Sequence, residues 1–297
     1  MTSVLYDAPG PRAKRRNILY TVGFLLLLVL LLWWMIGELD DKGQLTSAKW
    51  HPFVVSTSWT TYLLPGLVNT LKAAGLSMVI ALPLGAVFGI ARLSDHKWVR
   101  VPAGVVVEFF RAIPVLMLMI FANQLYVSAD GISSDIRPLY AVVTGLVLYN
   151  ASVLAEIVRA GILSLPKGQA EAAHAIGLRK TQVMTSILLP QAITAMLPAI
   201  VSQLVVVVKD TALGGAVLGF GELINSRKTF AANYANVIPS FIVIAAIYIV
   251  LNLILTTFAA WLERRLRRGK KSTGAVLPAL DPAGGAGTGT GASAGLV

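Results

Sequence analysis

Long apolar runs separated by short polar segments dominate this chain. The first, Ile18 to Ile36, carries no charged residue, and its length is close to the roughly 20 residues that a helix needs to cross a bilayer. Lipid gives the backbone no hydrogen-bond partner, so such runs cross it as helices. Further apolar runs extend over Tyr62 to Ile90, Val101 to Val127, Pro138 to Ile162, Gln191 to about Val217, and Val237 to Trp261. The pattern predicts an all-α integral membrane protein with about six transmembrane helices.

The first run follows a basic segment, as the apolar region of a signal peptide would. However, it is long and ends in Trp33-Trp34-Met35-Ile36-Gly37-Glu38, without the small residues of a cleavage site. We therefore interpret it as a retained span.

The Lys and Arg residues fall unequally on the two sides that six spans create. One side holds Arg12, Lys14, Arg15, Arg16, Arg92, Lys97, Arg100, Lys167, Arg179, Lys180, Arg264, Arg265, Arg267, Arg268, Lys270 and Lys271. The other side holds only Lys42, Lys49, Arg137, Arg227 and Lys228. Because cytoplasmic segments retain an excess of positive charge, this distribution predicts that both termini are cytoplasmic.

Composition excludes several classes of protein. Hydrophobic residues make up 56% of the 297 residues and charged residues only 13%, which does not fit a soluble enzyme. The net charge of +11 arises beside apolar runs rather than on one polar face, so it indicates membrane topology and not nucleic-acid binding. The absence of cysteine rules out disulfides and thiolate metal sites. After Lys271 a tail rich in Gly, Ala, Ser and Thr is expected to be disordered.

One polar segment, Ser164 to Pro190, has the composition of a helical hairpin on the cytoplasmic side. Ser164 and Pro166 suit a helix start, and strong helix formers follow over Gln169 to Ile176. Gly177 can close that helix in the left-handed conformation. We expect Thr181 to cap a second short helix, which Pro190 brings to an end.

Glu171-Ala172-Ala173, Gly177 and Ile187-x-Leu189-Pro190 resemble the EAA loop of permease subunits in bacterial ATP-binding-cassette (ABC) importers. The longer pattern, Pro166-Lys-Gly-Gln-Ala-Glu-Ala-Ala and Leu189-Pro-Gln191, is similar to the polar amino acid branch, the histidine and glutamine permease type. The resemblance implies that this loop contains a coupling helix that docks in a cytoplasmic ATPase. It assigns ATPase coupling to Glu171, Ala172, Ala173, Gly177, Leu189 and Pro190.

The resemblance runs from about Thr70 to Leu223. Phe110-Arg111-Ala112-Ile113-Pro114 resembles the branch's Arg-Gly-Thr-Pro element but departs from it at Ala112 and Ile113. Glu156-Ile-Val-Arg159-Ala-Gly161 and Lys209-Asp-Thr-Ala-Leu213 resemble two further elements, with alanine replacing glycine at 160 and serine at 212. Ser152-Val153 stands where the family commonly has Ala-Tyr. These departures keep the charged positions, so they weaken the inference of substrate more than that of family.

Charged residues inside the spans need a partner or a water-filled path, because each costs about 2.5–3.5 kcal/mol at mid-bilayer. Glu108 and Arg111 are three residues apart, as are Glu156 and Arg159, so each pair can meet on one helix face. We favour a neutralised structural pair for Glu108 and Arg111. For the second pair, a structural role and a role in transmitting motion of the hairpin stay equally open.

Other polar residues are candidates for the path or its gate. Lys209 and Asp210 are adjacent, so they point about a hundred degrees apart on a helix and are expected to reach different partners. Asn69 and Thr70 are candidates for the external half of the path, where Lys72 could instead snorkel to the interface. The candidate path and gating residues are Asn69, Thr70, Arg111, Glu156, Arg159, Lys209 and Asp210.

The sequence contains no phosphate-binding loop: Gly269-Lys-Lys-Ser272 lacks the preceding glycine and follows a predicted helix. We expect no ATP hydrolysis by this chain and no cofactor in it, with ATP and Mg bound by the partner ATPase. His51, His96 and His174 show no metal-binding spacing. No catalytic constellation appears, which disfavours a membrane-embedded enzyme.

The resemblance implies an ABC type I importer transmembrane-domain fold in the bacterial plasma (inner) membrane. The expected divisions are a basic cytoplasmic N-terminus (1–16), an additional span and external loop (17–62), the permease domain with its coupling loop at 164–190 (63–264), and a basic, then disordered tail (265–297). The implied partners are two cytoplasmic ATPases, a second permease chain or a second copy of this one, and an extracytoplasmic amino acid-binding protein. Glutamate is the first expectation for the cargo, since the extensions resemble actinobacterial glutamate permeases. The alternative is a secondary amino acid transporter without an ATPase.

Overall fold

The computed structural model describes residues 10–128 and 131–268, and every regular element in these ranges is a helix. The long helices are α1 (Pro11–Asp41), α4 (Leu64–Ala91), α5 (Lys97–Ala112), α6 (Val115–Ser128), α7 (Arg137–Leu163), α10 (Leu189–Leu218), α11 (Leu223–Tyr234) and α12 (Val237–Arg268). The short ones are α2 (Ser47–Trp50), η1 (His51–Val54), α3 (Ser56–Ser58), η2 (Trp59–Leu63), α8 (Lys167–Ala175), α9 (Lys180–Val183) and η3 (Met184–Leu188). The tail predicted to be disordered, 272–297, lies outside the described residues, and helix α12 continues to Arg268.

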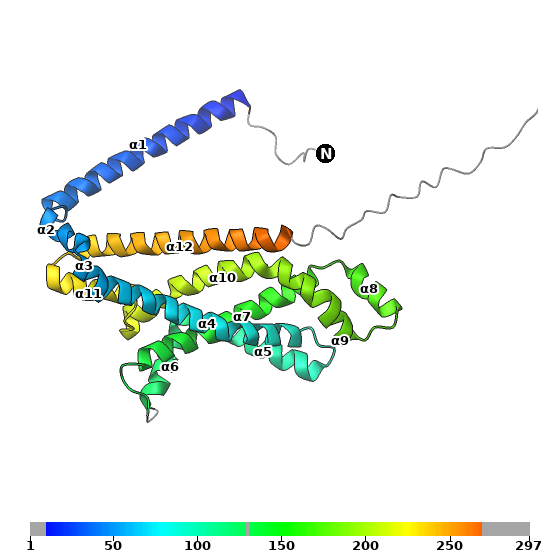
Figure 1. Ribbon diagram of the computed structural model, residues 1–297. Helices are drawn as coiled ribbons and strands as arrows, with labels where there is room; N and C mark the ends of the chain where they lie inside the picture. Colours follow the sequence, from blue (N-terminus) through cyan, green and yellow to red (C-terminus); the bar gives the residue numbers. More distant parts are fainter. Residues whose placement is uncertain (1–9, 129–130, 269–297) are drawn as a thin grey trace, which may run out of the picture.

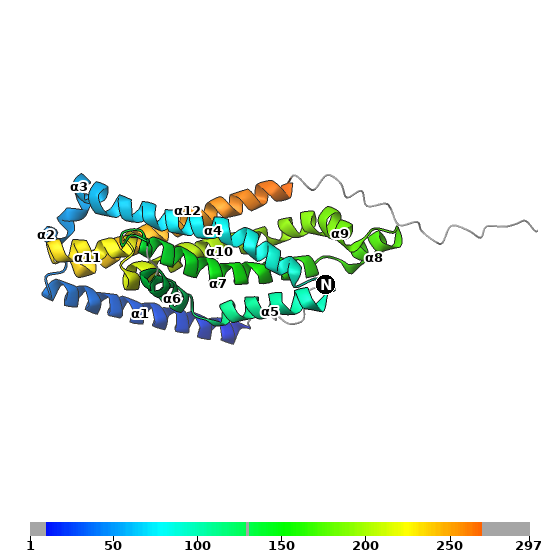
Figure 2. The same cartoon turned by 90° about the horizontal axis from the view of Figure 1, so that it is seen from below.

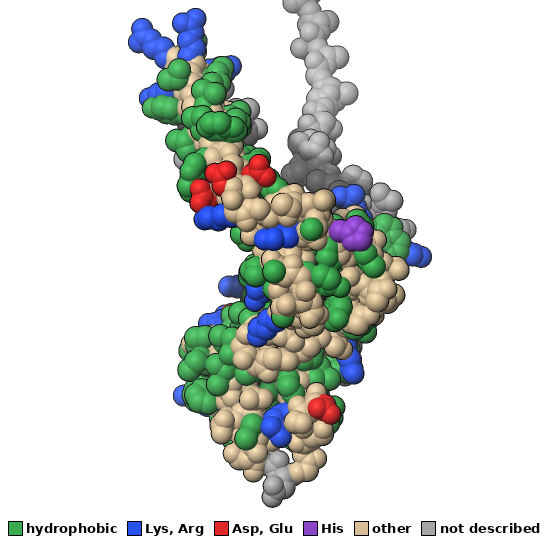
Figure 3. Space-filling model, turned by 90° about the vertical axis from the view of Figure 1, so that its left-hand side faces the viewer, with side chains coloured by type: hydrophobic (Ala, Val, Ile, Leu, Met, Phe, Trp, Pro, Cys, Tyr) green, Lys and Arg blue, Asp and Glu red, His purple; other side chains and the backbone are tan. Residues whose placement is uncertain are grey.

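Helix α7 lies at the centre of a bundle with α4, α6 and α10, while α12 packs along α10 (Figure 1). The core between these helices is apolar and includes Met78, Met119, Leu146, Leu154 and Val207. We call the end where α8 and α9 lie the hairpin end, and the end where α2, α3 and α11 lie the α11 end. Figure 3 looks onto the α11 end, over which basic side chains are scattered rather than gathered in one patch.

Small residues bring α4 and α7 together. Ser77, Ala81, Gly85 and Gly89 recur every four residues and are all buried. A Cβ atom at Gly89 would lie 2.7 Å from the carbonyl oxygen of Ala155 on α7. Within a membrane such close backbone packing replaces the hydrophobic driving force that is absent between apolar helices in lipid.

Five helical segments are long and apolar enough to cross a membrane: Pro11–Asp41, Ser56–Ala91, Arg137–Leu163, Lys180–Leu218 and Val237–Leu262. They contain five of the six predicted spans. The exception is the third prediction, Val101 to Val127.

The prediction of one continuous helix over Val101 to Val127 is wrong. Helices α5 and α6 meet at a bend of 98°. Ile113 has extended backbone angles, φ −88° and ψ 130°, because the ring of Pro114 disfavours the helical conformation in the residue before it. The two helices together therefore form a broken span or a re-entrant segment.

Helix α1 stands apart from the bundle, and none of its residues is buried (Figures 1 and 2). The segment that follows it is anchored. Phe53 of η1 stacks on Phe230 of α11 with ring centroids 4.8 Å apart, and both belong to an apolar cluster with Leu63, Leu223 and Ile244.

Candidate functional site: the coupling hairpin and the charged residues of the bundle

The predicted hairpin is present at the hairpin end. Helix α8 ends at Ala175, and Gly177 has φ +84°. The amide of Gly177 donates to the carbonyl of His174 (2.9 Å), and that of Leu178 donates to Ala173 (3.1 Å). These two bonds form a Schellman motif, which requires a left-handed residue after the helix and therefore favours glycine. The prediction that Gly177 closes this helix is confirmed.

The hairpin exposes only part of the motif. Glu171 and Ala172 are exposed, whereas Ala173 is buried. Ile176 at the tip leaves 78% of its surface exposed. Thus a carboxylate, a small side chain and one large apolar side chain are offered to the surroundings, while Ala173 holds α8 to its own hairpin.

Two predictions about the second half of the hairpin are wrong. The second helix begins at Lys180, and its cap is Arg179, whose amide donates to the side chain of Gln182 (2.9 Å), so Thr181 is not the capping residue. Pro190 does not end the helix, since the segment runs on to Leu218. A π-helical turn, η3, precedes the proline, and Pro190 then lies in the first turn of α10, where no intrahelical donor is required.

A chain of ion pairs crosses three helices at the hairpin half of the bundle. Both predicted pairs are present: Arg111 donates to Glu108 (2.8 Å), and Arg159 donates to Glu156 (2.6 Å). Arg92 at the end of α4 joins them, since its guanidinium donates to Glu156 (2.8 Å) and to Glu108 (2.9 Å). Three guanidinium groups and two carboxylates thus form one network. The sequence interpretation assigned Arg92 only to the positive side and missed this role.

A hollow of about 460 Å³ lies at the break between α5 and α6. Its polar lining residues are Arg111, Tyr149, Gln203 and Asp210, from α5, α7 and α10. The first turn of α6 begins here, and the free N–H groups of a helix start favour negative charge. The hollow therefore combines a guanidinium, a carboxylate and a helix N-terminus.

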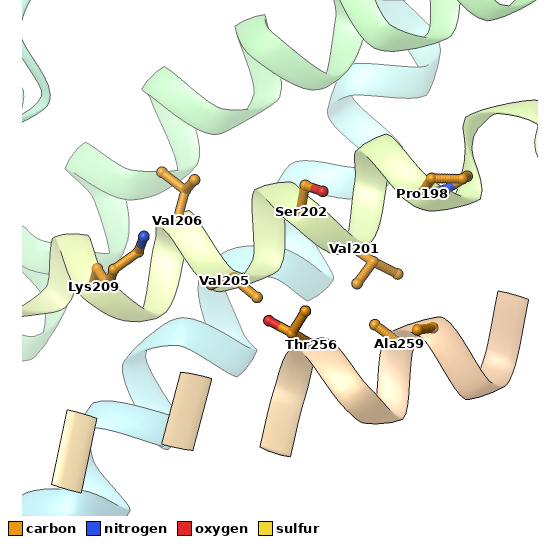
Figure 4. A pocket seen from close by; sticks show the side chains of 9 residues that line it. Pro198, Val201, Ser202, Val205, Val206, Lys209, Thr256 and Ala259 are labelled. Atoms are coloured by element: carbon orange, nitrogen blue, oxygen red, sulfur yellow. The ribbon is translucent and has the colours of Figure 1, made fainter. Parts of the chain in front are cut away.

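Lys209 faces a different hollow, of about 270 Å³, between α10 and α12 (Figure 4). Its neighbours there include Val201, Val205, Ser202 and Thr256. Among the described residues neither Lys209 nor Asp210 forms an ion pair. The two adjacent charges thus lie in different surroundings, as their helical spacing predicts.

Asn69 and Thr70 contact the junction between α10 and α11. The Asn69 amide donates to the carbonyl of Gly221 (2.7 Å). The Thr70 hydroxyl lies 3.1 Å from the carbonyl of Gly66 and accepts from the amide of Leu223 (3.2 Å). Thr70 is fully buried, so its contacts in this structure are structural. A role in the path stays a prediction for both residues.

Glu222, which the sequence interpretation missed, is fully buried in the same junction. Its carboxylate caps α11 by accepting from the amides of Ile224 and Asn225 (both 2.9 Å), and it accepts from the Tyr248 hydroxyl (2.6 Å). Burial raises the pKa of this carboxyl above its ordinary value, although these hydrogen bonds oppose the shift. An acidic residue three positions before an amide-rich helix start was the available signal for a cap.

The sequence interpretation also missed a polar contact in the core. The Gln203 side chain on α10 donates to Asn150 on α7 (2.6 Å), and Asn150 in turn donates to the carbonyl of Leu146 (2.7 Å). Asn150 is fully buried. Each residue sits alone in an apolar run, so only helix packing brings them together. Among the described residues no group of three His, Asp or Glu side chains could hold a metal ion.

Residues 81–268 match the family described as "Binding-protein-dependent transport system inner membrane component". The chain is 48% identical over 232 residues to the glutamate transport system permease protein GluD of Corynebacterium glutamicum, covering 78% of this chain and 85% of that one. It is 35% identical to the arginine transport system permease protein ArtQ of Bacillus subtilis, over 69% of this chain and 93% of the relative.

Solved structures agree with this comparison. The crystal structure of an amino acid ABC transporter with histidines has a TM-score of 0.64 and 29% identity, over 70% of this chain and 95% of that one. The MetNI methionine ABC transporter shares the fold at 24% identity and a TM-score of 0.57, over 72% of this chain and 99% of that one. The all-helical architecture, the hairpin and these matches together decide against a secondary transporter. The chain belongs to the family of inner membrane components of binding-protein-dependent transport systems, as a permease subunit of the ABC type.

Proposed function

We propose that this chain forms the translocation path of an ATP-driven importer of glutamate or a related acidic amino acid. Two cytoplasmic ATPases, with their ATP and Mg, would drive it. A second permease subunit or a second copy of this chain would complete the path, and an extracytoplasmic binding protein would deliver the amino acid. The likeness to a glutamate permease at 48% identity supports the cargo. Both termini would be cytoplasmic, as the distribution of Lys and Arg predicts.

The observation that carries the proposal is the exposed hairpin with its left-handed Gly177. Helix α8 presents Glu171 and Ala172 on its surface, where an ATPase could approach closely and pair with the carboxylate. Ala173, Leu189 and Pro190 would maintain the shape of the hairpin. Because α8 is joined to α7 and to α10, movement of the hairpin would reach both helices that line the hollow at the α5–α6 break.

We assign the substrate path to the hollow at that break. An acidic amino acid carries one ammonium and two carboxylates. Asp210 would bind the ammonium, while Arg111 and the start of α6 would bind carboxylate oxygens, so that the charges offset the cost of desolvation. Glu156 and Arg159 lie in the ion-pair network and would act on the path through Arg92 and Glu108. Lys209, which faces the other hollow, would act at a gate or a subunit interface, and Asn69 and Thr70 would act at the α11 end.

The test is extraction in mild detergent, identification of the proteins that co-purify, and uptake of labelled glutamate by reconstituted vesicles. Glu171→Ala and Gly177→Val should reduce recovery of the ATPase and abolish ATP-dependent uptake. The matched control is Gly168→Ala, because Gly168 has nothing within 4 Å of an added Cβ and no left-handed backbone. Wild-type chain that yields no ATPase even after cross-linking would overturn the proposal.

The path assignment needs its own variants. Asp210→Asn and Arg111→Gln should raise the glutamate concentration needed for half-maximal uptake while leaving ATPase recovery unchanged. Uptake that is unaffected by both variants would remove this hollow from the path.

A further inference from the structure

The turn between α4 and α5, Arg92 to His96, is tied to the coupling hairpin by a single side chain. Lys180, the first residue of α9, reaches the turn, donates to the carbonyl of Leu93 (3.0 Å), and forms an ion pair with Asp95. The hydrogen bond from Lys180 holds the pKa of Asp95 below its usual range. Lys180 lies only three residues after Gly177, so the tether starts where the hairpin turns.

The turn and the hairpin are otherwise partly separated. A hollow of about 480 Å³ lies between them, lined by residues from both sides such as Leu93, His96, Thr181 and Met184. Lys180 spans this hollow. Removing its charge would therefore loosen the turn from the hairpin without creating a cavity in the apolar core.

The same turn begins with Arg92, the residue that joins Glu156 on α7 to Glu108 on α5. The Arg92 side chain is only 14% exposed, so these two pairs are partly shielded from water and are screened less than surface pairs. From Glu108 the network continues to Arg111, which lines the hollow at the α5–α6 break. Contacts thus run without interruption from the hairpin to that hollow.

We propose that the turn Arg92 to His96 is a second coupling element, through which Lys180 and Arg92 transmit displacement of the hairpin to α5 and to the α5–α6 break. This inference rests on the proposed function of the hairpin. Covalent continuity already links α8 to α7 and α10, but it does not reach α5. The Lys180 tether and the Arg92 pairs supply that missing link, as positioning residues that need not touch the substrate.

The first test measures how far the amino acid-loaded binding protein stimulates the ATPase in reconstituted vesicles. Lys180→Gln and Asp95→Asn should each lower the stimulation about two- to fivefold, the range expected for an exposed ion pair, while basal ATP hydrolysis stays at the wild-type level. The charge-reversed double variant Asp95→Lys, Lys180→Asp should recover part of the stimulation. Lys97→Gln is the matched control, because Lys97 is exposed on the same turn and forms no ion pair among the described residues.

The second test asks whether the turn and the hairpin move together. The natural sequence contains no cysteine, so Asp95→Cys and Lys180→Cys can be cross-linked selectively with a short bis-thiol reagent. We expect the same cross-linking yield with and without trapped ATP, whereas a pair placed at Gly168 and Trp98 should change. A yield at 95 and 180 that differs between the nucleotide states would overturn the inference.

The two proposals fail differently. If no ATPase co-purifies and no uptake occurs, the proposed function itself is wrong. If the complex assembles and imports, but Lys180→Gln, Asp95→Asn and Arg92→Gln all keep wild-type stimulation, only the second coupling element is wrong.

Discussion

The two ends of the bundle both hold acidic side chains, but in opposite surroundings. At the α11 end, Glu222 is fully buried and accepts from fixed backbone amides and one hydroxyl. At the hairpin end, Glu108 and Glu156 share three guanidinium groups and keep 51% and 27% of their side chains exposed. A buried carboxylate with fixed donors is costly to disturb, whereas partly hydrated ion pairs exchange partners at little cost. We expect the α11 end to behave as a rigid scaffold and the hairpin end as the part that adjusts.

The strongest way to break this contrast is Glu222→Ala. The change removes the cap of α11 and leaves the Tyr248 hydroxyl and two amides without their acceptor, which should cost about 2–4 kcal/mol in the free energy of unfolding. Thermal unfolding in detergent measures it. Glu38→Ala is the control, because Glu38 forms only an exposed pair with Lys42. Equal melting temperatures for the two variants would contradict a rigid α11 end.

Gly215→Ala should act on the same junction from the opposite side. A Cβ at Gly215 would overlap the Glu222 carboxylate, so the added methyl should cost about 1–3 kcal/mol through overpacking. Gly75→Ala on α4 provides the comparison, since an added Cβ there meets nothing within 4 Å and should stabilise the helix slightly. If Gly215→Ala melts like Gly75→Ala, the junction has room that the structure does not show.

The pH dependence of stability should also differ between the two ends. Burial raises the pKa of Glu222 in the folded chain above its ordinary value of 4.5. The folded state therefore binds this proton more tightly, so the stabilisation is complete below pH 4.5 and is lost as pH rises through the folded pKa. The slope cannot exceed about 1.4 kcal/mol per pH unit for one proton. Melting temperatures from pH 4.5 to 8 should fall less in Glu222→Gln than in the wild type; parallel curves would exclude Glu222 as the source.

Arg92→Gln should have a smaller effect on stability. It breaks two partly shielded ion pairs, for which we expect a loss of about 1–2 kcal/mol, between the values for exposed and buried pairs. Measuring the melting temperature at low and high salt tests this origin, because screening should shrink the difference between variant and wild type. A difference that is independent of salt would point to lost packing instead.

Glu108→Gln should be the mildest of these changes. Half of the Glu108 side chain is exposed, and Arg92 keeps its contact with Glu156 in its absence. We expect less than about 1 kcal/mol, measured by the same thermal unfolding. A larger loss would show that the hairpin end is as rigid as the α11 end.

Local chemistry was sufficient for several parts of the functional site. Gly177 was predictable because a helix that stops without proline needs a left-handed residue, and few other residues adopt that conformation. The pairs Glu108–Arg111 and Glu156–Arg159 were predictable because residues three apart share a helix face. Arg92 was not, because its partners lie 16 and 64 positions away in the sequence.

Other features carried a signal that the sequence interpretation did not use. Pro114 was visible inside the third apolar run, and its effect on Ile113 is enough to explain the bend. Pro190 misled in the opposite direction: a proline in the first turn of a helix is compatible with continuation, and the π-turn η3 before it could not be inferred from composition.

The sequence by itself determined that this chain is an all-helical membrane protein, where five of its spans lie, and that it carries a hairpin closed by Gly177. These properties depend on hydrophobic length, charge distribution and backbone preference, which act over neighbouring residues. Only the tertiary structure decided that Arg92 joins three helices, that Lys180 tethers the α4–α5 turn, and that Glu222 is buried under α12. These contacts depend on which helix faces meet, and apolar runs that are hydrophobic all round do not encode a facing direction.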